Sequence, residues 1–205
     1  PQIVDEVSKG GEFQISLGGE RREIAAMFVD IRGFTSLSEN LEPEEVVEIL
    51  NEYLNLTTHA IFKNGGTLDK FIGDATMAVF NAPFDLDDYI YRAVCTARDI
   101  VAGAQDLEDR MEKRFHKKVN FGIGISCGPA VVGNVGCDFR MDYTAIGDTV
   151  NTASRLEGKA GASEILISEP VYEALKDRIR VTEKGMIPLK GKAKEICVYS
   201  VEEVL

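Results

Sequence analysis

The stretch "MFVDIRGFTSLSE", residues 27–39, ends an apolar run with a carboxylate, Asp30, and continues into a glycine and several hydroxyl residues. With the residues before it, this run reads "REIAAMFVDI" and predicts a short buried strand. Later, "DKFIGDATMAVF", residues 69–80, places Gly73 and Asp74 between two short apolar runs, which predicts a β-hairpin. The sequence therefore directs two acids, Asp30 and Asp74, out of the most buried parts of a predicted sheet.

Helical patterns separate and follow these strands. Residues 41–66 carry apolar side chains at helical spacing, with Pro43 in the first turn and two glycines at the end. Residues 87–115 form a second amphipathic pattern of the same kind. A third helix is expected within residues 147–161, with Asp148 as its N-cap.

The predicted elements follow the order β-α-β-β-α-β, which is completed by a buried strand within residues 118–136. This order is that of a ferredoxin-like α+β core. Residues 164–175 and 185–203 add further strands and a helix at the C-terminal end. Residues 1–22 are polar and contain two glycine pairs, so we expect a linker or a hairpin there, with the folded domain over residues 23–205.

Composition limits the class of partner. The 205 residues suit one large domain. The net charge is −11, from 34 acidic and 23 basic residues. This charge disfavours a nucleic-acid surface, because contacts to phosphate backbones need clustered Lys and Arg. A small anionic ligand held by a few local cations stays compatible with it.

The cysteines and the apolar runs indicate the cellular compartment. The four cysteines have no C-x-x-C spacing, so we expect core thiols in a reducing compartment; they are Cys95, Cys127, Cys137 and Cys197. No apolar run approaches the roughly 18 residues of a membrane-spanning helix. We therefore expect a cytoplasmic domain without direct membrane insertion. Because the sequence starts without Met, we expect a longer parent chain with regulatory domains.

The acid pair indicates metal and phosphate chemistry. Two close carboxylates repel each other unless a cation lies between them. Hard oxygen ligands favour Mg²⁺ or Mn²⁺. After Asp30 the chain turns at Gly33 into an expected helix start, where free backbone N–H groups can bind phosphate. The alternative is that Asp30 and Asp74 are only a helix cap and a turn residue.

Five motifs resemble the catalytic domain of the class III nucleotidyl cyclases, and the wording of the last is similar to bacterial and cyanobacterial soluble-type adenylyl cyclases. They occur in family order between about residues 23 and 201; they are "FVDIRGFT", "LDKFIGDATMAVF", "GIGISCG", "VVGNVG" and "DYTAIGDTVNTASRLE". The resemblance implies that the family's two metal-binding aspartates fall on Asp30 and Asp74, with Ile31 as a further ligand. It implies two Mg²⁺ or Mn²⁺ ions per active site. The backbone that wraps the triphosphate corresponds to Ile31, Gly33, Phe34 and Thr35.

The resemblance also implies residues that read the base and stabilise the transition state. The adenine-reading lysine falls on Lys70, and the second base-reading position falls on Thr144, where many members carry Asp. The transition-state pair falls on Asn151 and Arg155, which are four residues apart and hence on one face of a helix. Two basic residues are implied for the triphosphate, Arg140 and Lys190, of which Arg140 aligns loosely by one residue.

The activity implied by the resemblance is conversion of ATP to 3′,5′-cyclic AMP and pyrophosphate in a homodimer with two shared active sites, as part of second-messenger signalling. One alternative is a cyclase that acts on GTP or makes another cyclic product. A second is an inactive module for dimerisation or nucleotide sensing, which the intact set of residues disfavours. With threonine at position 144, the sequence resembles the subgroup of these cyclases that is associated with bicarbonate stimulation. The lone histidines, His59 and His116, offer no alternative metal site or Ser-His-Asp triad.

Overall fold

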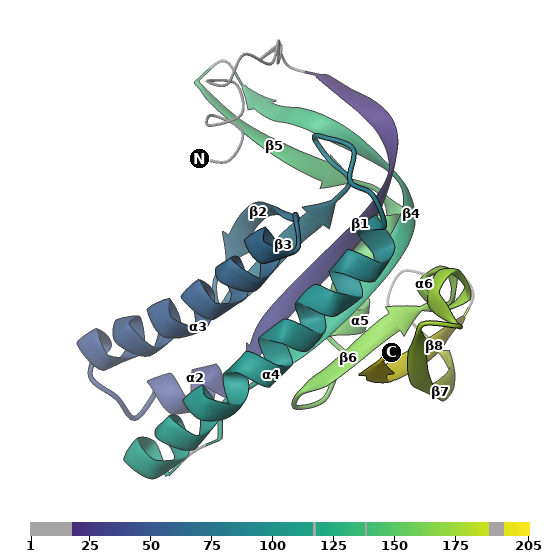
Figure 1. Cartoon of the computed structure of the whole chain (residues 1–205). Coiled ribbons are helices and arrows are strands. Elements are labelled where there is room, and N and C mark those ends of the chain that lie inside the picture. The colour runs from purple at the N-terminus through teal and green to yellow at the C-terminus, as the bar shows by residue number, and fades with distance from the viewer. Residues whose placement is uncertain (1–17, 117, 138, 189–194) are drawn as a thin grey trace.

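The computed structural model describes residues 18–116, 118–137, 139–188 and 195–205 (Figure 1). Its elements in chain order are β1 (Gly18–Arg32), α2 (Phe34–Ser38), α3 (Pro43–Lys63), β2 (Thr67–Ile72), β3 (Ala75–Phe80), α4 (Tyr89–Phe115), β4 (Asn120–Cys137), β5 (Arg140–Ile146), α5 (Asp148–Glu157), β6 (Glu164–Ser168), α6 (Glu169–Leu175), β7 (Ile179–Ile187) and β8 (Ile196–Val204). The predicted helices over 41–66 and 87–115 are thereby confirmed as α3 and α4.

The strands form one eight-stranded sheet in the order β2-β3-β1-β4-β6-β8-β7, with β5 paired to β4. The first four strands of this path have the ferredoxin-like arrangement, with β1 antiparallel to both β3 and β4. The predicted α+β class with C-terminal additions is confirmed. β1 begins at Gly18, which pairs with Asn134, so residues 18–22 of the segment expected as a linker or hairpin are part of this strand. Residues 1–17 of that expected segment lie outside the described part of the chain.

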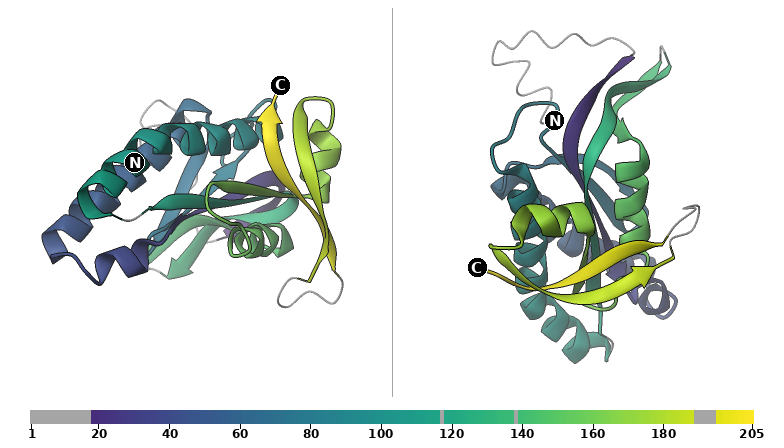
Figure 2. Two further views of the ribbon diagram at one scale, coloured as in Figure 1. Left: turned by 90° about the horizontal axis from the view of Figure 1, so that it is seen from below. Right: turned by 90° about the vertical axis from the view of Figure 1, so that its right-hand side faces the viewer.

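β1 is the central strand because both of its faces are apolar. Its alternate side chains point to opposite faces, as the two-residue period of a strand requires. Ala25, Met27 and Val29 pack toward α3 and α4, whereas Ile24 and Phe28 join the cluster that contains α5. Figure 2 shows the helices on both sides of the sheet. The middle of the strand, residues 24–29, is held between two layers, whereas residues 18–23 are mostly exposed and the other end at Asp30 is partly exposed.

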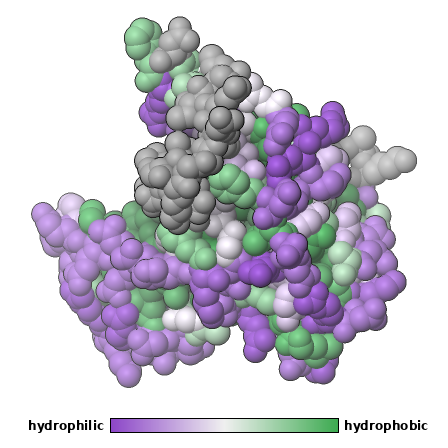
Figure 3. All heavy atoms as spheres, turned by 45° about the horizontal axis from the view of Figure 1, so that its top comes forward, coloured by the Kyte–Doolittle hydropathy of each residue, from purple (hydrophilic) through white to green (hydrophobic). Residues whose placement is uncertain are grey.

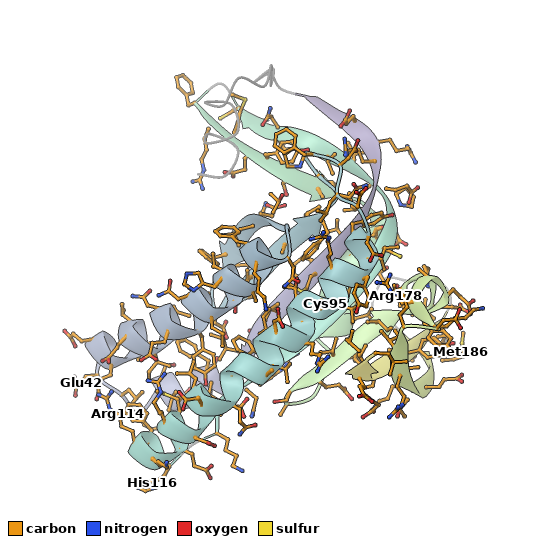
Figure 4. The ribbon with its side chains drawn as sticks, in the orientation of Figure 1. Glu42, Cys95, Arg114, His116, Arg178 and Met186 are labelled. Carbon is orange, nitrogen blue, oxygen red and sulfur yellow. The ribbon has the colours of Figure 1, made fainter. Side chains whose placement is uncertain are left out.

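The long helices α3 and α4 lie side by side on one face of the sheet. The start of α3 carries a capping box, in which Glu42 and Glu45 satisfy each other's backbone N–H groups. Near the end of α4, Arg114 pairs with Glu45 over 3.2 Å. Figure 4 shows Glu42 and Arg114 close together where these helices begin and end. This pairing holds the two helices as one layer over the sheet.

Helix α5 packs on the opposite face of the sheet, closely against β4. A Cβ atom at Gly124 would collide with the backbone of Ala153 and Glu157, so glycine permits this close approach. The predicted N-cap at Asp148 is wrong, because Gly147 occupies the cap position and Asp148 is the first helical residue. The backbone of Gly147 has φ 147°, which glycine adopts without strain, so the chain enters the helix one residue earlier.

The C-terminal strands are tied to the start of α4. Arg178, just before β7, donates two hydrogen bonds of 2.8 Å to Asp88, and its guanidinium stacks over Tyr91. Three of the four cysteines are partly buried and free, as expected of core thiols. Cys137, however, is exposed, because it is the last residue of β4, beyond the cover of the helices. No helix in the described residues is long and apolar enough to cross a membrane.

Candidate active site

Asp30 and Asp74 face each other at one end of the sheet. β1 and β3 pair antiparallel up to Val29 and Thr76, which places Asp30 beside the β2–β3 turn. Gly73 takes φ 63° in this turn and Asp74 follows it, as a tight hairpin requires. Burial raises the pKa of Asp74, and the neighbouring carboxyl of Asp30 raises it further. The structure therefore brings the two predicted acids together, in a pair that favours an added positive charge.

Two residues that the motif analysis did not select complete this acid cluster. The guanidinium of Arg32 contacts Asp30 Oδ2 at 3.0 Å and Glu157 Oε1 at 2.8 Å, and it also donates to the backbone carbonyl of Glu157. Burial, and then the charge of Asp30, raise the pKa of Glu157 to about 7. Arg32 could have been found from the sequence, since residues two apart on a strand share a face. Glu157 could not, because only the packing of α5 on β4 brings it there.

The donor set at this end of the sheet fits a hard divalent cation. The carboxyl groups of Asp30 and Asp74 lie next to each other, and positive charge relieves the repulsion between them. Among the described residues no group of three His, Cys, Asp or Glu side chains could hold a metal ion alone. A cation here therefore needs further oxygens from a backbone carbonyl, from water or from a phosphate ligand.

The segment after Asp30 forms the expected turn and helix start. Ile31 is buried in the core between the sheet and α3, and Gly33 adopts φ 81° at the N-cap of α2. Phe34 packs partly against the same core, while Thr35 is exposed. The first N–H groups of a helix have no partner within it. Ile31 and Arg32 pair with β4, so the donors that this rule leaves without an intrahelical partner lie at the start of α2, at Phe34 and Thr35.

A second polar cluster connects β2 with β5. Thr144 Oγ1 donates a 2.7 Å hydrogen bond to Asp69 Oδ2, and the backbone N–H of Ala145 lies 3.4 Å from the same oxygen. Lys70 Nζ lies 3.5 Å from Asp69 Oδ1. Burial raises the pKa of Asp69, and the hydrogen bond from Thr144 partly offsets that rise. The structure brings the two predicted base-reading residues together around a carboxylate that the motif analysis did not select.

Asn151 and Arg155 lie on α5, with Asn151 exposed and Arg155 partly buried. Within the residues that the structure describes, no hydrogen bond or ion pair joins either of them to Asp30 or Asp74. The helix instead contacts the acid cluster through Glu157. The predicted transition-state residues and the predicted metal ligands of one chain are thus not in direct contact.

Of the two basic residues predicted to bind a triphosphate, the structure describes only Arg140. Arg140 begins β5, its side chain is mostly exposed, and it lies 3.9 Å from a carboxylate oxygen of Asp142. It makes no direct contact with the acid cluster among the described side chains. Lys190 lies outside the described residues, in the segment 189–194.

Comparison with known proteins identifies the family. Residues 19–203 match the family model of the adenylate and guanylate cyclase catalytic domain. Adenylate cyclase 1 of Rhizobium meliloti is 36% identical over 90% of this chain, and the adenylate cyclase of Anabaena cylindrica is 35% identical over 98% of it. The chain spans only 28% and 41% of the length of these two relatives.

Solved structures of both nucleotide specificities are similar to this chain. The adenylyl cyclase CyaB from P. aeruginosa shares 39% identity at a TM-score of 0.88, covering 92% of this chain and 98% of its own. The guanylyl cyclase Cya2 shares 35% identity at a TM-score of 0.85, covering 92% and 95%. The resemblance read from the sequence is confirmed: the chain belongs to the family of adenylate and guanylate cyclase catalytic domains.

Proposed function

We propose that this domain is an adenylyl cyclase that converts ATP to 3′,5′-cyclic AMP and pyrophosphate. The observation that carries the proposal is the pair of clusters, one of facing acids at Asp30 and Asp74 and one of base-reading groups at Lys70 and Thr144. Similar proteins include an adenylyl and a guanylyl cyclase, so overall similarity does not decide whether the substrate is ATP or GTP. The choice of ATP rests on the hydrogen-bonding groups near Lys70.

Lys70 and Thr144 complement adenine and not guanine. Adenine offers an acceptor at N1 and donor hydrogens on its 6-amino group. Lysine is a donor only, and a threonine hydroxyl can accept. Guanine reverses this edge, with a donor at N1 and an acceptor at O6, so Lys70 would face a hydrogen. A polar group left unpaired on binding costs free energy, and sites built on hydrogen bonds reject such analogues strongly.

The metal site is assigned to Asp30 and Asp74, with the backbone of Ile31 as a further ligand. Two divalent ions, Mg²⁺ or Mn²⁺, when bound there favour ionisation of the ribose 3′-hydroxyl and neutralise triphosphate charge. The chain's own part is to hold both carboxylates toward one point. The backbone from Ile31 to Thr35 receives the phosphates, with Arg140 and Lys190 supplying positive charge to them.

The ring closure is a displacement at the α-phosphorus. The 3′-oxygen forms the new bond, the bond to pyrophosphate breaks, and the proton of the 3′-hydroxyl passes to water or a carboxylate. Arg155 stabilises the negative charge that develops around the phosphorus, as arginines do in phosphoryl transfer. Asn151 orients the ribose, so that most of the rate gain is positioning and electrostatics.

The active unit is a homodimer with two shared sites. The contact that is missing within one chain, between the acid pair and Asn151 or Arg155, is then made across a two-fold interface. Large apolar side chains are exposed on β2 and on the β4–β5 hairpin; they are Phe71, Ile72, Val131, Val135, Phe139, Met141 and Ile146. Figure 3 shows hydrophobic residues reaching the surface in patches on one face. Exposed apolar patches of this kind are typical of protein interfaces.

The domain is assigned to a cytoplasmic, ATP-dependent signalling protein with regulatory domains elsewhere in the parent chain. The free cysteines agree with a reducing compartment. One similar structure, a bacterial light-regulated adenylyl cyclase, is covered by this chain over only 58% of its length. Bicarbonate stimulation, suggested by Thr144, is tested by adding bicarbonate at constant pH and measuring turnover.

One experiment tests the activity against its rivals. Purified protein is incubated with Mn²⁺ and either ATP or GTP, and the product is identified by chromatography and mass spectrometry. Cyclic AMP from ATP, absent with Asp30→Ala, is expected. Cyclic GTP as the main product would favour the guanylyl cyclase. No cyclic product with either nucleotide would favour the inactive module.

A further inference from the structure

Asp69 is a buried carboxylate whose surroundings require an explanation. Its side chain is 2% exposed, whereas that of the adjacent Lys70 is 40% exposed. An ionised carboxylate taken out of water is costly unless hydrogen bonds and opposite charge compensate. Oδ2 of Asp69 accepts from the Thr144 hydroxyl and the Ala145 N–H, whereas the buried Oδ1 has no hydrogen-bond partner among the described residues and lies 3.5 Å from the Lys70 ammonium. The carboxylate thus contacts both residues that are proposed to read the base.

A β-bulge places Asp69 and Lys70 together. In the β2–β3 ladder, Leu68 pairs with Ala78 and Lys70 pairs with Met77, so β2 has one extra residue at Asp69. Successive side chains of a regular strand point to opposite faces. A bulge breaks this alternation and redirects a side chain, and bulges are frequent next to active sites. The irregularity is what allows the Asp69 carboxylate to lie within 3.5 Å of Lys70 Nζ.

The Asp69 carboxylate lies inside the protein, between two hairpins. A small cavity separates β2 and β3 from β4 and β5; it is lined by Thr67, Asp69, Val79, Val132, Tyr143, Thr144 and Ala145. Thr144 is itself buried, at 7% exposure. The carboxylate therefore binds the Thr144 hydroxyl from the interior of the protein.

The hydrogen bond from Thr144 to Asp69 decides what this hydroxyl can offer to a base. A free hydroxyl has one hydrogen and two lone pairs, and it rotates to donate or to accept. We infer that Asp69 is a specificity-determining residue, because its carboxylate takes the single hydroxyl hydrogen of Thr144 and leaves that oxygen as an acceptor only. This inference rests on the proposed function, in which Lys70 and Thr144 contact the base.

The consequence is discrimination at position 6 of the purine. An acceptor-only oxygen pairs with the 6-amino group of adenine and repels the O6 of guanine. A threonine without Asp69 could rotate and donate to O6 instead. The negative charge of Asp69 also balances Lys70, which reduces the cost of holding this cation against an uncharged base. Asp69 acts through its neighbours and is therefore a positioning residue.

The test measures kcat/KM for ATP and for GTP with Mn²⁺ in wild type and Asp69→Ala. We expect the ATP/GTP ratio to fall about tenfold or more, because sites built on hydrogen bonds lose discrimination when those bonds are lost. Asp69→Leu, which fills similar space without an acceptor, serves if the alanine variant does not fold. Asp69→Asn keeps an acceptor oxygen and should retain more of the preference. Circular dichroism checks folding.

A double-mutant cycle with Thr144→Val separates this role from a structural one. Because valine lacks the hydroxyl, Asp69→Ala should leave the ATP/GTP ratio of Thr144→Val within about twofold. A ratio that is unchanged in folded Asp69→Ala and Asp69→Leu, or a full additional fall in the Thr144→Val background, would overturn the inference. If wild type forms no cyclic nucleotide, the proposed function fails; if it forms cyclic AMP and only the ratio is unmoved, the role of Asp69 alone fails.

Discussion

The same sheet holds carboxylates in two different surroundings. At the end of β1, Asp30 and Asp74 face each other, and the neighbouring charge of Asp30 contributes to the raised pKa of Asp74. Between β2 and β5, Asp69 is surrounded by a hydroxyl, a backbone N–H and a lysine. In the first group the two carboxyl groups repel each other although Arg32 contacts Asp30, so the pair suits an added cation. Asp69 instead accepts hydrogen bonds at Oδ2 and has Lys70 beside its buried Oδ1, an arrangement that suits the orientation of its neighbours.

The largest effect on turnover is expected from removing either carboxylate of the Asp30–Asp74 pair. Asp30→Ala or Asp74→Ala should lower cyclic AMP formation by ~10³-fold or more, because each ~1.4 kcal/mol of lost transition-state stabilisation is tenfold in rate. Turnover with Mn²⁺ and ATP is the measurement, and Asp109→Asn on the exposed face of α4 is the control. Either alanine variant keeping more than half of wild-type activity would make the metal assignment wrong.

Mixing two inactive variants tests whether the acid pair and α5 act across an interface. Asp30→Ala and Arg155→Ala, mixed in equal amounts, should recover about a quarter of wild-type activity, because half of the dimers are mixed and each carries one intact site. Turnover is measured over a range of protein concentration, with subunit exchange followed by fluorescent labels. Mixed dimers that form but remain inactive would contradict shared sites.

Changing the two base readers should alter substrate choice without touching the acid pair. Guanylyl members of the family carry Glu and Cys at these positions, so Lys70→Glu with Thr144→Cys should move the preference toward GTP by about tenfold or more. The ratio of kcat/KM values for ATP and GTP is measured in wild type and in the double variant. A wild type that uses both nucleotides equally would contradict the role of Lys70 and Thr144.

Alanine substitution should change the free energy of unfolding differently at Asp69 and at Asp74. Asp69→Ala removes the acceptor of a buried hydroxyl and should lower the free energy of unfolding by about 1–3 kcal/mol. Asp74→Ala in metal-free protein removes a repelling charge and should leave that free energy unchanged or higher. Urea denaturation in the presence of a chelator measures both. An equal loss of stability in the two variants would show that the groups do not differ in this way.

The smallest effect is a pH dependence from Glu157. Its pKa is raised to about 7, so above its ordinary pKa of about 4.3 the folded protein binds more protons at this site than the unfolded chain. The free energy of unfolding of metal-free protein should therefore fall as the pH rises through this window. Glu157→Gln should reduce that fall by about 1–3 kcal/mol between about pH 5 and about pH 8, measured by urea denaturation. Glu39→Gln, at an exposed site, should change nothing.

Much of the fold could be read from local patterns. The central strands carry apolar runs and the long helices carry a helical apolar period, and the order of the elements then restricts the topology. The start of β1 at Gly18 depends on pairing with β4, and the cap of α5 depends on the φ of Gly147. Neither pairing nor backbone torsion is visible in a periodicity of side chains.

The sequence by itself determined the ferredoxin-like core and located the acids Asp30 and Asp74 and the proposed base-reading residues Lys70 and Thr144, because these lie in contiguous motifs. Only the tertiary structure showed that Asp69 and Glu157 belong to these two clusters. Asp69 reaches Thr144, 75 residues away, through a bulge, and Glu157 reaches Arg32, 125 residues away, through the packing of α5 on Gly124. The physical reason is that such contacts depend on register and close packing between distant segments, which no local pattern encodes.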